Sequence, residues 1–214
     1  MTSILSFPID KAKLAWLDFS AKNQDLHSMN PDDTKAFSSY VFGLIDEQNA
    51  QLGIGGWLED RRIYNTREQF NLGKSRSIHL GVDIWMSAGT PLFCPEDCEI
   101  HSFTNNEGFG NYGPTIILKS LGEELYYLFG HLSLESLEGK LKGQTLKEGE
   151  PFAEIGNYPI NGDWPPHLHF QVMNNLFGKE GDFPGVCARN ELKVFEKVCL
   201  CPYPFLGISA PQDV

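Results

Sequence analysis

The chain has 214 residues, of which 41% are hydrophobic and 21% charged, and its 28 acidic against 17 basic side chains give a formal net charge of −11. This composition is typical of a globular protein with a full hydrophobic core, built as one domain with an appendage or as two small domains. The negative charge argues against a nucleic-acid ligand and against adsorption to anionic membranes or cell-wall polymers.

The N-terminal sequence indicates where in the cell the protein acts. It lacks a basic region, and its short apolar stretch is interrupted by Pro8 and Asp10. No apolar run in the chain approaches the roughly 18–20 residues that span a bilayer. We therefore expect no secretory signal and a cytoplasmic location, with non-classical export as the other route.

The five cysteines are Cys94, Cys98, Cys187, Cys199 and Cys201. An odd number without an export signal argues against a disulfide framework. The three-residue and one-residue gaps between them differ from the two-residue gap that is usual in four-thiolate zinc sites. The sequence therefore favours buried, reduced thiols.

Residues 1–55 are predicted to form an N-terminal helical region. Apolar residues recur at the i, i+3, i+4, i+7 and i+8 positions of one helical face; they are Phe37, Tyr40, Val41, Leu44 and Ile45. In the preceding Asn30-Pro31-Asp32-Asp33, the asparagine can cap the helix, the proline suits its first turn, and the two aspartates favour the positive end of the helix dipole. A shorter helix is expected around residues 10–21. We expect this region to pack as an appendage on a main domain of residues 56–214.

The main domain is predicted to be mainly β. Glycines recur between short apolar or alternating segments, which lie at residues 78–86, 98–103, 115–119, 125–129, 152–155 and 167–173. Many short strands separated by glycine-containing turns indicate an antiparallel sheet fold, either a sandwich or a barrel-like arrangement.

His79 and Asp83, in the sequence HLGVD, are both competent Zn²⁺ ligands. The neighbouring Ile84 and Trp85 predict a strand, in which residues four apart point the same way but lie roughly 13 Å from each other. Both side chains reach one ion only if the chain bends between them, and Gly81 would permit that bend. Alone, this motif is weak evidence for a metal site.

His167 and His169 alternate with apolar residues in PPHLHFQV. On a strand, these imidazoles and Gln171 would share one face, while Leu168 and Phe170 would face the core. The Cα atoms of the two histidines would lie roughly 7 Å apart, close enough to serve one site.

His131 follows Gly130 at the end of an apolar run and alone would be a turn histidine; His27 and His101 have no comparable neighbours. Two histidines and one carboxylate would leave the fourth position of Zn²⁺ for water, as in catalytic zinc sites. Two further imidazoles would then remain to transfer protons or stabilise an oxyanion. No serine-nucleophile elbow, phosphate-binding loop or HExxH motif competes with this interpretation.

The ordered motifs HLGVD, GHLS and PPHLHFQV resemble those of the M23 metallopeptidases, the lysostaphin and LytM-type endopeptidases, over roughly residues 56–180. The resemblance implies an antiparallel core of the duplicated hybrid type. It implies one Zn²⁺ held by His79, Asp83 and His169, with His131 and His167 as the catalytic pair that does not bind the metal. It also implies a peptide or muropeptide substrate of the peptidoglycan type.

Three departures from the family pattern concern the cleft. Asp163-Trp164-Pro165 stands where many members have Ser-Thr-Gly, and Gln171 replaces a final acid. The stretch NLGKSRS before HLGVD lacks the tyrosine that assists the oxyanion in well-known members, and Tyr64 and Tyr112 are the alternative candidates.

Two other classes of function share this fold type. A binding or regulatory protein would keep zinc without hydrolysis, which the altered cleft motifs favour and the complete histidine pair disfavours. A phosphocarrier would use two facing histidines, but Asp83 beside them would repel the incoming anion. The oligomeric state is not predicted by any of these patterns.

Overall fold

The structure is a computed structural model that describes residues 2–27, 29–61, 63–64 and 75–210. The helices are α1 (Thr34–Glu47) and α2 (Leu192–Phe195). The strands are β1 (Leu14–Leu17), β2 (Leu52–Gly55), β3 (Ile78–His79), β4 (Val82–Trp85), β5 (Pro91–Phe93), β6 (Cys98–Asn106), β7 (Gly113–Ser120), β8 (Tyr126–Gly130), β9 (Thr145–Leu146), β10 (Pro151–Glu154), β11 (His167–Met173), β12 (Val186–Cys187) and β13 (Cys199–Leu200).

Within the described ranges, the main sheet has the strand order β1-β2-β4-β11-β8-β7-β6-β9, and β13 also pairs with β11. Its pairs are antiparallel except for β1 with β2. Two smaller pairs, β10 with β5 and β12 with β3, lie outside this sheet. The predicted mainly β fold is confirmed, as an open sheet rather than a closed barrel.

Alternation along the central strands β4 and β11 separates two buried environments. Val82, Ile84, Leu168 and Phe170 face the largest apolar cluster. The opposite face carries Asp83 and Trp85 on β4 and the histidines on β11, and it is buried as well. Because side chains alternate along a strand, one short sequence supplies both the core and the site.

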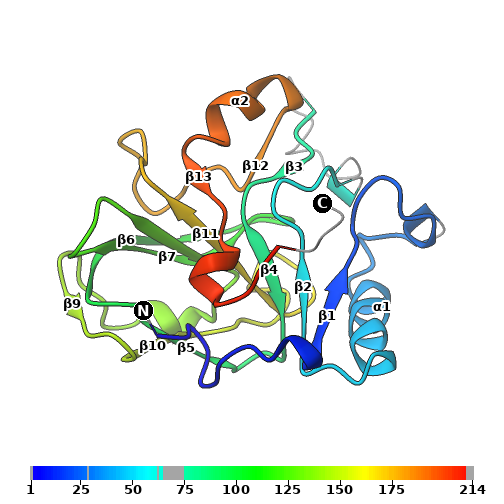
Figure 1. The fold of residues 1–214 in the computed structure, drawn as a ribbon, viewed down its shortest axis with the longest axis horizontal. Helices are drawn as coiled ribbons and strands as arrows, with labels where there is room; N and C mark the ends of the chain where they lie inside the picture. The colour runs from blue at the N-terminus through cyan, green and yellow to red at the C-terminus, as the bar shows by residue number, and fades with distance from the viewer. Residues whose placement is uncertain (1, 28, 62, 65–74, 211–214) are drawn as a thin grey trace.

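The helix predicted from Phe37 is confirmed as α1. Its cap is Asp33 rather than the expected Asn30: the Asp33 side chain accepts a hydrogen bond from the backbone N–H of Ala36. Phe37, Val41 and Ile45 are buried in the second apolar cluster. Figure 1 shows α1 beside β1 and β2, at the edge of the sheet away from β9.

The helix predicted around residues 10–21 is wrong. Asp10 caps only a single 3₁₀ turn, Lys11–Lys13, and Leu14–Leu17 then runs as β1 parallel to β2. Pairing with Leu52–Gly55 and packing of the strand against α1 outweigh a weak local helical tendency. Residues 1–55 thus supply α1 together with two strands of the main sheet, and the domain boundary at residues 55/56 stays a prediction.

The described cysteines are unpaired, and four of them are buried while Cys201 is half-buried. Cys94 and Cys98 lie in the first apolar cluster and Cys187 and Cys199 in the third. They therefore act as small apolar side chains, as the sequence predicted. None of the helices in the described ranges is long and apolar enough to cross a bilayer.

Candidate metal centre and active-site cleft

His79 and Asp83 reach one point because the chain bends between them. His79 ends β3, and β4 begins at Val82, so the expected single strand is divided at Gly81. A Cβ atom on Gly81 would lie 2.6 Å from the carbonyl oxygen of Phe170 and 2.7 Å from Nε2 of His169. Glycine therefore permits the close packing of the bend against β11.

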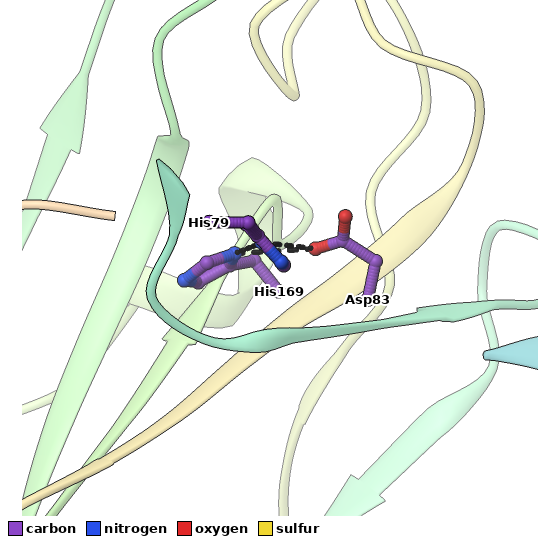
Figure 2. A group of neighbouring side chains, drawn as sticks. All are labelled: His79, Asp83 and His169. Carbon is purple, nitrogen blue, oxygen red and sulfur yellow. Dashed lines mark hydrogen bonds and ion pairs between the residues drawn. The ribbon is translucent and has the colours of Figure 1, made fainter. Parts of the chain in front are cut away.

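His169 meets this pair because β11 runs antiparallel to β4, in a register that places His169 opposite Asp83. Oδ1 of Asp83 lies 3.2 Å from Nε2 of His79 and 3.2 Å from Nδ1 of His169, and these two nitrogens are 3.0 Å apart. Figure 2 shows the three groups converging. Tetrahedral ligands at about 2.0–2.1 Å from zinc are themselves about 3.3 Å apart, so the spacing suits one ion.

Hydrogen bonds on the far side of each ring fix which nitrogen carries the proton. Nδ1 of His79 donates to the carbonyl of Gly56 over 2.8 Å, so its Nε2 carries a lone pair. Nε2 of His169 donates to Oε1 of Gln171 over 3.0 Å, so its Nδ1 carries a lone pair. The Gln171 amide is oriented by donating to the carbonyl of Pro184.

Two nitrogen lone pairs and a carboxylate oxygen of Asp83 therefore face one another in a buried space. This arrangement is electrostatically unfavourable unless a cation lies between the three atoms. His79, Asp83 and His169 form the one group of potential metal ligands found among the described residues. The donor set fits Zn²⁺, with a fourth position left for water or substrate.

His131 and His167 lie next to this group. Their ring centroids are 4.2 Å apart, and Nε2 of His167 is 3.7 Å from Oδ1 of Asp83. Nδ1 of His131 donates to the carbonyl of Asn161 and Nδ1 of His167 to that of Pro165, each over 2.7 Å. Both rings therefore keep Nε2 unprotonated, which is the form of a proton acceptor.

Burial and neighbouring charges set the protonation states of the site residues to those that metal binding requires. Burial lowers the pKa of His79 and of His167 to about 4, and it lowers that of His131 well below the usual range. Burial alone would raise the pKa of Asp83, but nearby His79 and Arg61 hold it well below its usual range. Near neutral pH the imidazoles of His79, His131 and His167 are therefore neutral and the Asp83 carboxylate is ionised.

The five side chains line one cleft of about 420 Å³. Its walls also hold basic Arg76 and Lys179, acidic Glu107 and Asp182, and the aromatic rings of Tyr64, Tyr112 and Trp164. The indole of Trp85 stacks on His167 with the ring centroids 4.2 Å apart, which restricts the rotation of this imidazole.

The structure places the two candidate tyrosines differently. The Tyr112 hydroxyl lies 3.4 Å from Nε2 of His169, on the side of the ring away from the metal-facing Nδ1. The Tyr64 hydroxyl accepts a hydrogen bond from Arg61 over 3.1 Å. Both rings line the cleft, and the choice between them as an oxyanion donor stays open.

Sequence reasoning assembled the histidines and Asp83 but missed the groups that orient them. Arg61 donates to the second oxygen of Asp83, and Gln171, expected as a departure in the cleft, instead supports His169. No signal in the sequence singles out Arg61, because it lies within the charged run Glu-Asp-Arg-Arg of GGWLEDRRIY. His101 lies in another hollow, beside Tyr126, and the side chain of His27 lies outside the described residues.

Comparisons with known proteins agree with this site. Residues 77–180 match the model of Peptidase family M23. A protein of Haemophilus influenzae described as an uncharacterized metalloprotease is 34% identical over 97 residues, which are 45% of this chain and 19% of that protein. The matched stretch is therefore about a fifth of that relative's length.

Two solved structures are also similar. The catalytic domain of the antimicrobial peptidase lysostaphin from Staphylococcus simulans shares 25% identity over 61% of this chain and 80% of that chain, with a TM-score of 0.42. A zinc containing peptidase from Vibrio cholerae shares 24% identity over 45% of this chain and 27% of that chain, with a TM-score of 0.36. Residues 77–180 of this chain therefore match peptidase family M23 in sequence, and the geometry of the candidate metal centre agrees with that match.

Proposed function

We propose that this protein is a zinc-dependent metallopeptidase that hydrolyses peptide bonds. One observation carries the proposal: three buried ligand atoms, on His79, Asp83 and His169, converge with their lone pairs toward one point beside two more neutral imidazoles. A structural zinc site is closed by four protein ligands, whereas this one has three among the described residues and opens into a cleft.

When bound, Zn²⁺ would activate a water molecule and polarise the scissile carbonyl. The side chains of the chain supply the proton transfers. His131 and His167 each present an unprotonated Nε2, because the carbonyls of Asn161 and Pro165 hold the proton on Nδ1. Either ring accepts the proton of the attacking water, and the resulting imidazolium stabilises the oxyanion or protonates the leaving amine.

The proposed substrate is a peptide of the peptidoglycan type, as the resemblance of the three motifs implies. Basic Arg76 and Lys179 and acidic Glu107 and Asp182 in the cleft walls suit a chain that bears both charges. The net charge of −11 disfavours an intact anionic cell wall. Soluble muropeptides are therefore the preferred form of the substrate.

The test is hydrolysis of soluble muropeptides, followed by mass spectrometry and by the appearance of new amino groups. Zinc-loaded wild type should cleave them, and a chelator should abolish the cleavage. His131→Ala and His167→Ala should keep zinc and lose about 10²- to 10⁴-fold in rate, because each removes one general acid–base group. If zinc-loaded protein cleaved neither muropeptides nor unrelated peptides, the peptidase proposal would fail.

A second candidate is a zinc-retaining protein that binds peptides without cleaving them. It is favoured by Trp164, which belongs to the altered cleft motif Asp163-Trp164-Pro165. Its indole is buried at the cleft, with the ring centroid 6.3 Å from that of His131, and so takes up space beside the proposed catalytic pair. In this case muropeptides would bind to the zinc-loaded protein and remain intact in the same assay. If the protein is such a binder, Trp164→Gly should still cleave nothing. If the protein is a peptidase whose cleft the indole only narrows, Trp164→Gly should cleave muropeptides faster than wild type.

A further inference from the structure

Arg61 is the one fully buried basic side chain that contacts the candidate metal centre within the described ranges, and it lies outside the matched residues 77–180. Its Nη1 donates to Oδ2 of Asp83, and Oδ1 of the same carboxylate faces the two ligand nitrogens. The two oxygens of Asp83 are thus divided between a guanidinium and the metal position.

The backbone fixes Arg61 with respect to this carboxylate. The segment before it pairs with β3, since Leu58 donates to the carbonyl of His79 and His79 donates to that of Glu59. Asp60 forms an antiparallel bridge with Ile78, and the N–H of Arg61 donates to the carbonyl of Ser77. The segment that carries Arg61 is therefore hydrogen-bonded to the strand that carries a metal ligand.

Nε and Nη1 of the guanidinium make further hydrogen bonds. Nε donates to Oε2 of Glu59 over 2.6 Å, and Nη1 also donates to the Tyr64 hydroxyl. The Phe19 ring lies 5.4 Å from Cζ of Arg61. A Cβ atom on Gly55 would lie 2.6 Å from Nη2, so a glycine at this position leaves the space that the guanidinium occupies.

We propose that Arg61 is a positioning residue for the metal: by binding Oδ2 of Asp83, it restricts this carboxylate to a single ligand oxygen, Oδ1. A guanidinium stays charged at every physiological pH, so the restriction does not depend on a titration. Partners of metal ligands typically change metal affinity about 10- to 100-fold when they are removed. This inference rests on the proposed zinc site.

Two readouts test it without an activity assay. Zinc affinity is measured by competition with a chelator, and the coordination number is read from the visible absorption of the Co²⁺-substituted protein. Arg61→Met should weaken zinc about 10- to 100-fold. It should also shift the Co²⁺ spectrum toward the weaker absorption of a higher-coordinate ion, because both Asp83 oxygens become available. Arg61→Lys keeps the charge without the fork geometry and should be intermediate in both readouts.

The matched control is Arg189→Met, which breaks an exposed ion pair with Asp60 and should change neither readout. Gly55→Ala keeps the arginine but places a Cβ atom 2.6 Å from its Nη2, so the guanidinium must shift relative to Asp83, and this variant decides the question if Arg61→Met does not fold. A folded Arg61→Met or Gly55→Ala protein with wild-type zinc affinity and Co²⁺ spectrum would overturn the inference. Wild type that binds no zinc would instead overturn the proposed function.

Discussion

The two faces of the β4–β11 pair are equally buried, yet they are stabilised in different ways. One face holds Leu168 and Phe170 against hydrocarbon. The other holds Asp83, His167 and His169, each with a named polar partner. Apolar packing tolerates many neighbours, whereas buried polar groups need specific ones. The site therefore depends on specific partners distant in sequence, whereas the core depends mainly on the volume of its side chains.

The largest expected effects are on the free energy of unfolding, and they distinguish the two faces by substitutions at the neighbouring positions 169 and 170. Phe170→Ala opens a cavity in the core and should lower the free energy of unfolding by about 3–5 kcal/mol, with or without zinc. His169→Ala should instead abolish the stabilisation that zinc adds, which is about 2.7 kcal/mol at a zinc concentration 100 times the Kd. Urea unfolding of both variants, with zinc and with chelator, measures this. Equal zinc-dependent stabilisation in wild type and His169→Ala would contradict it.

The polar face should also make the metal-free protein sensitive to acid. The pKa of His79 and of His167 is about 4 in the folded chain, below the unfolded value near 6.5. Between these values the unfolded chain binds protons that the folded chain does not, so stability falls as the pH falls from about 6.5 to about 4. Each histidine contributes a slope of at most about 1.4 kcal/mol per pH unit.

Urea unfolding of chelator-treated protein at several pH values measures this slope. His167→Gln should make it shallower, because one of the titrating groups is gone. Phe170→Ala should lower stability at every pH and leave the slope unchanged. A metal-free protein equally stable at pH 7 and pH 5 would contradict the account, because the folded chain would then bind as many protons as the unfolded chain and the pKa values of these imidazoles would not be lowered.

The smallest expected effect is on zinc affinity, and it comes from the bend at Gly81 between the ligands His79 and Asp83. Gly81→Ala places a methyl group against the Phe170 carbonyl and the His169 ring, so it should weaken zinc about 10- to 100-fold. Gly43→Ala in α1 is the matched control, because a Cβ atom there meets nothing within 4 Å. It should add up to about 1 kcal/mol of stability and leave zinc affinity unchanged. Chelator competition measures the zinc affinity of both proteins. A loss in Gly81→Ala but not in Gly43→Ala shows that the effect comes from the bend and not from any glycine-to-alanine change.

Local patterns predicted most of the fold and the histidines of the site. The alternation in residues 167–173 reproduces β11, and the spacing from Phe37 gives the buried face of α1. Both patterns depend only on the geometry of a single strand or helix. The helix expected around residues 10–21 failed because β1 forms through its pairing with β2, 38 residues further along the chain at Leu14 and Leu52.

The partners of the site residues could not be predicted in the same way. Arg61 and Asp83 are 22 residues apart in sequence and meet only after the segment before Arg61 pairs with β3. Gln171 was visible as a substitution, but its bond to His169 depends on the rotation of that imidazole and on the carbonyl of Pro184. Register and side-chain rotation are set by the tertiary structure, which no motif encodes.

Zinc content, measured by elemental analysis, tests the central claim most directly. The proteins to compare are wild type, His169→Ala and His167→Ala, purified without chelator and then dialysed against zinc. The account predicts one zinc per chain in wild type and in His167→Ala, and none in His169→Ala. Zinc lost from His167→Ala but retained in His169→Ala, or absent from wild type after dialysis, would contradict it.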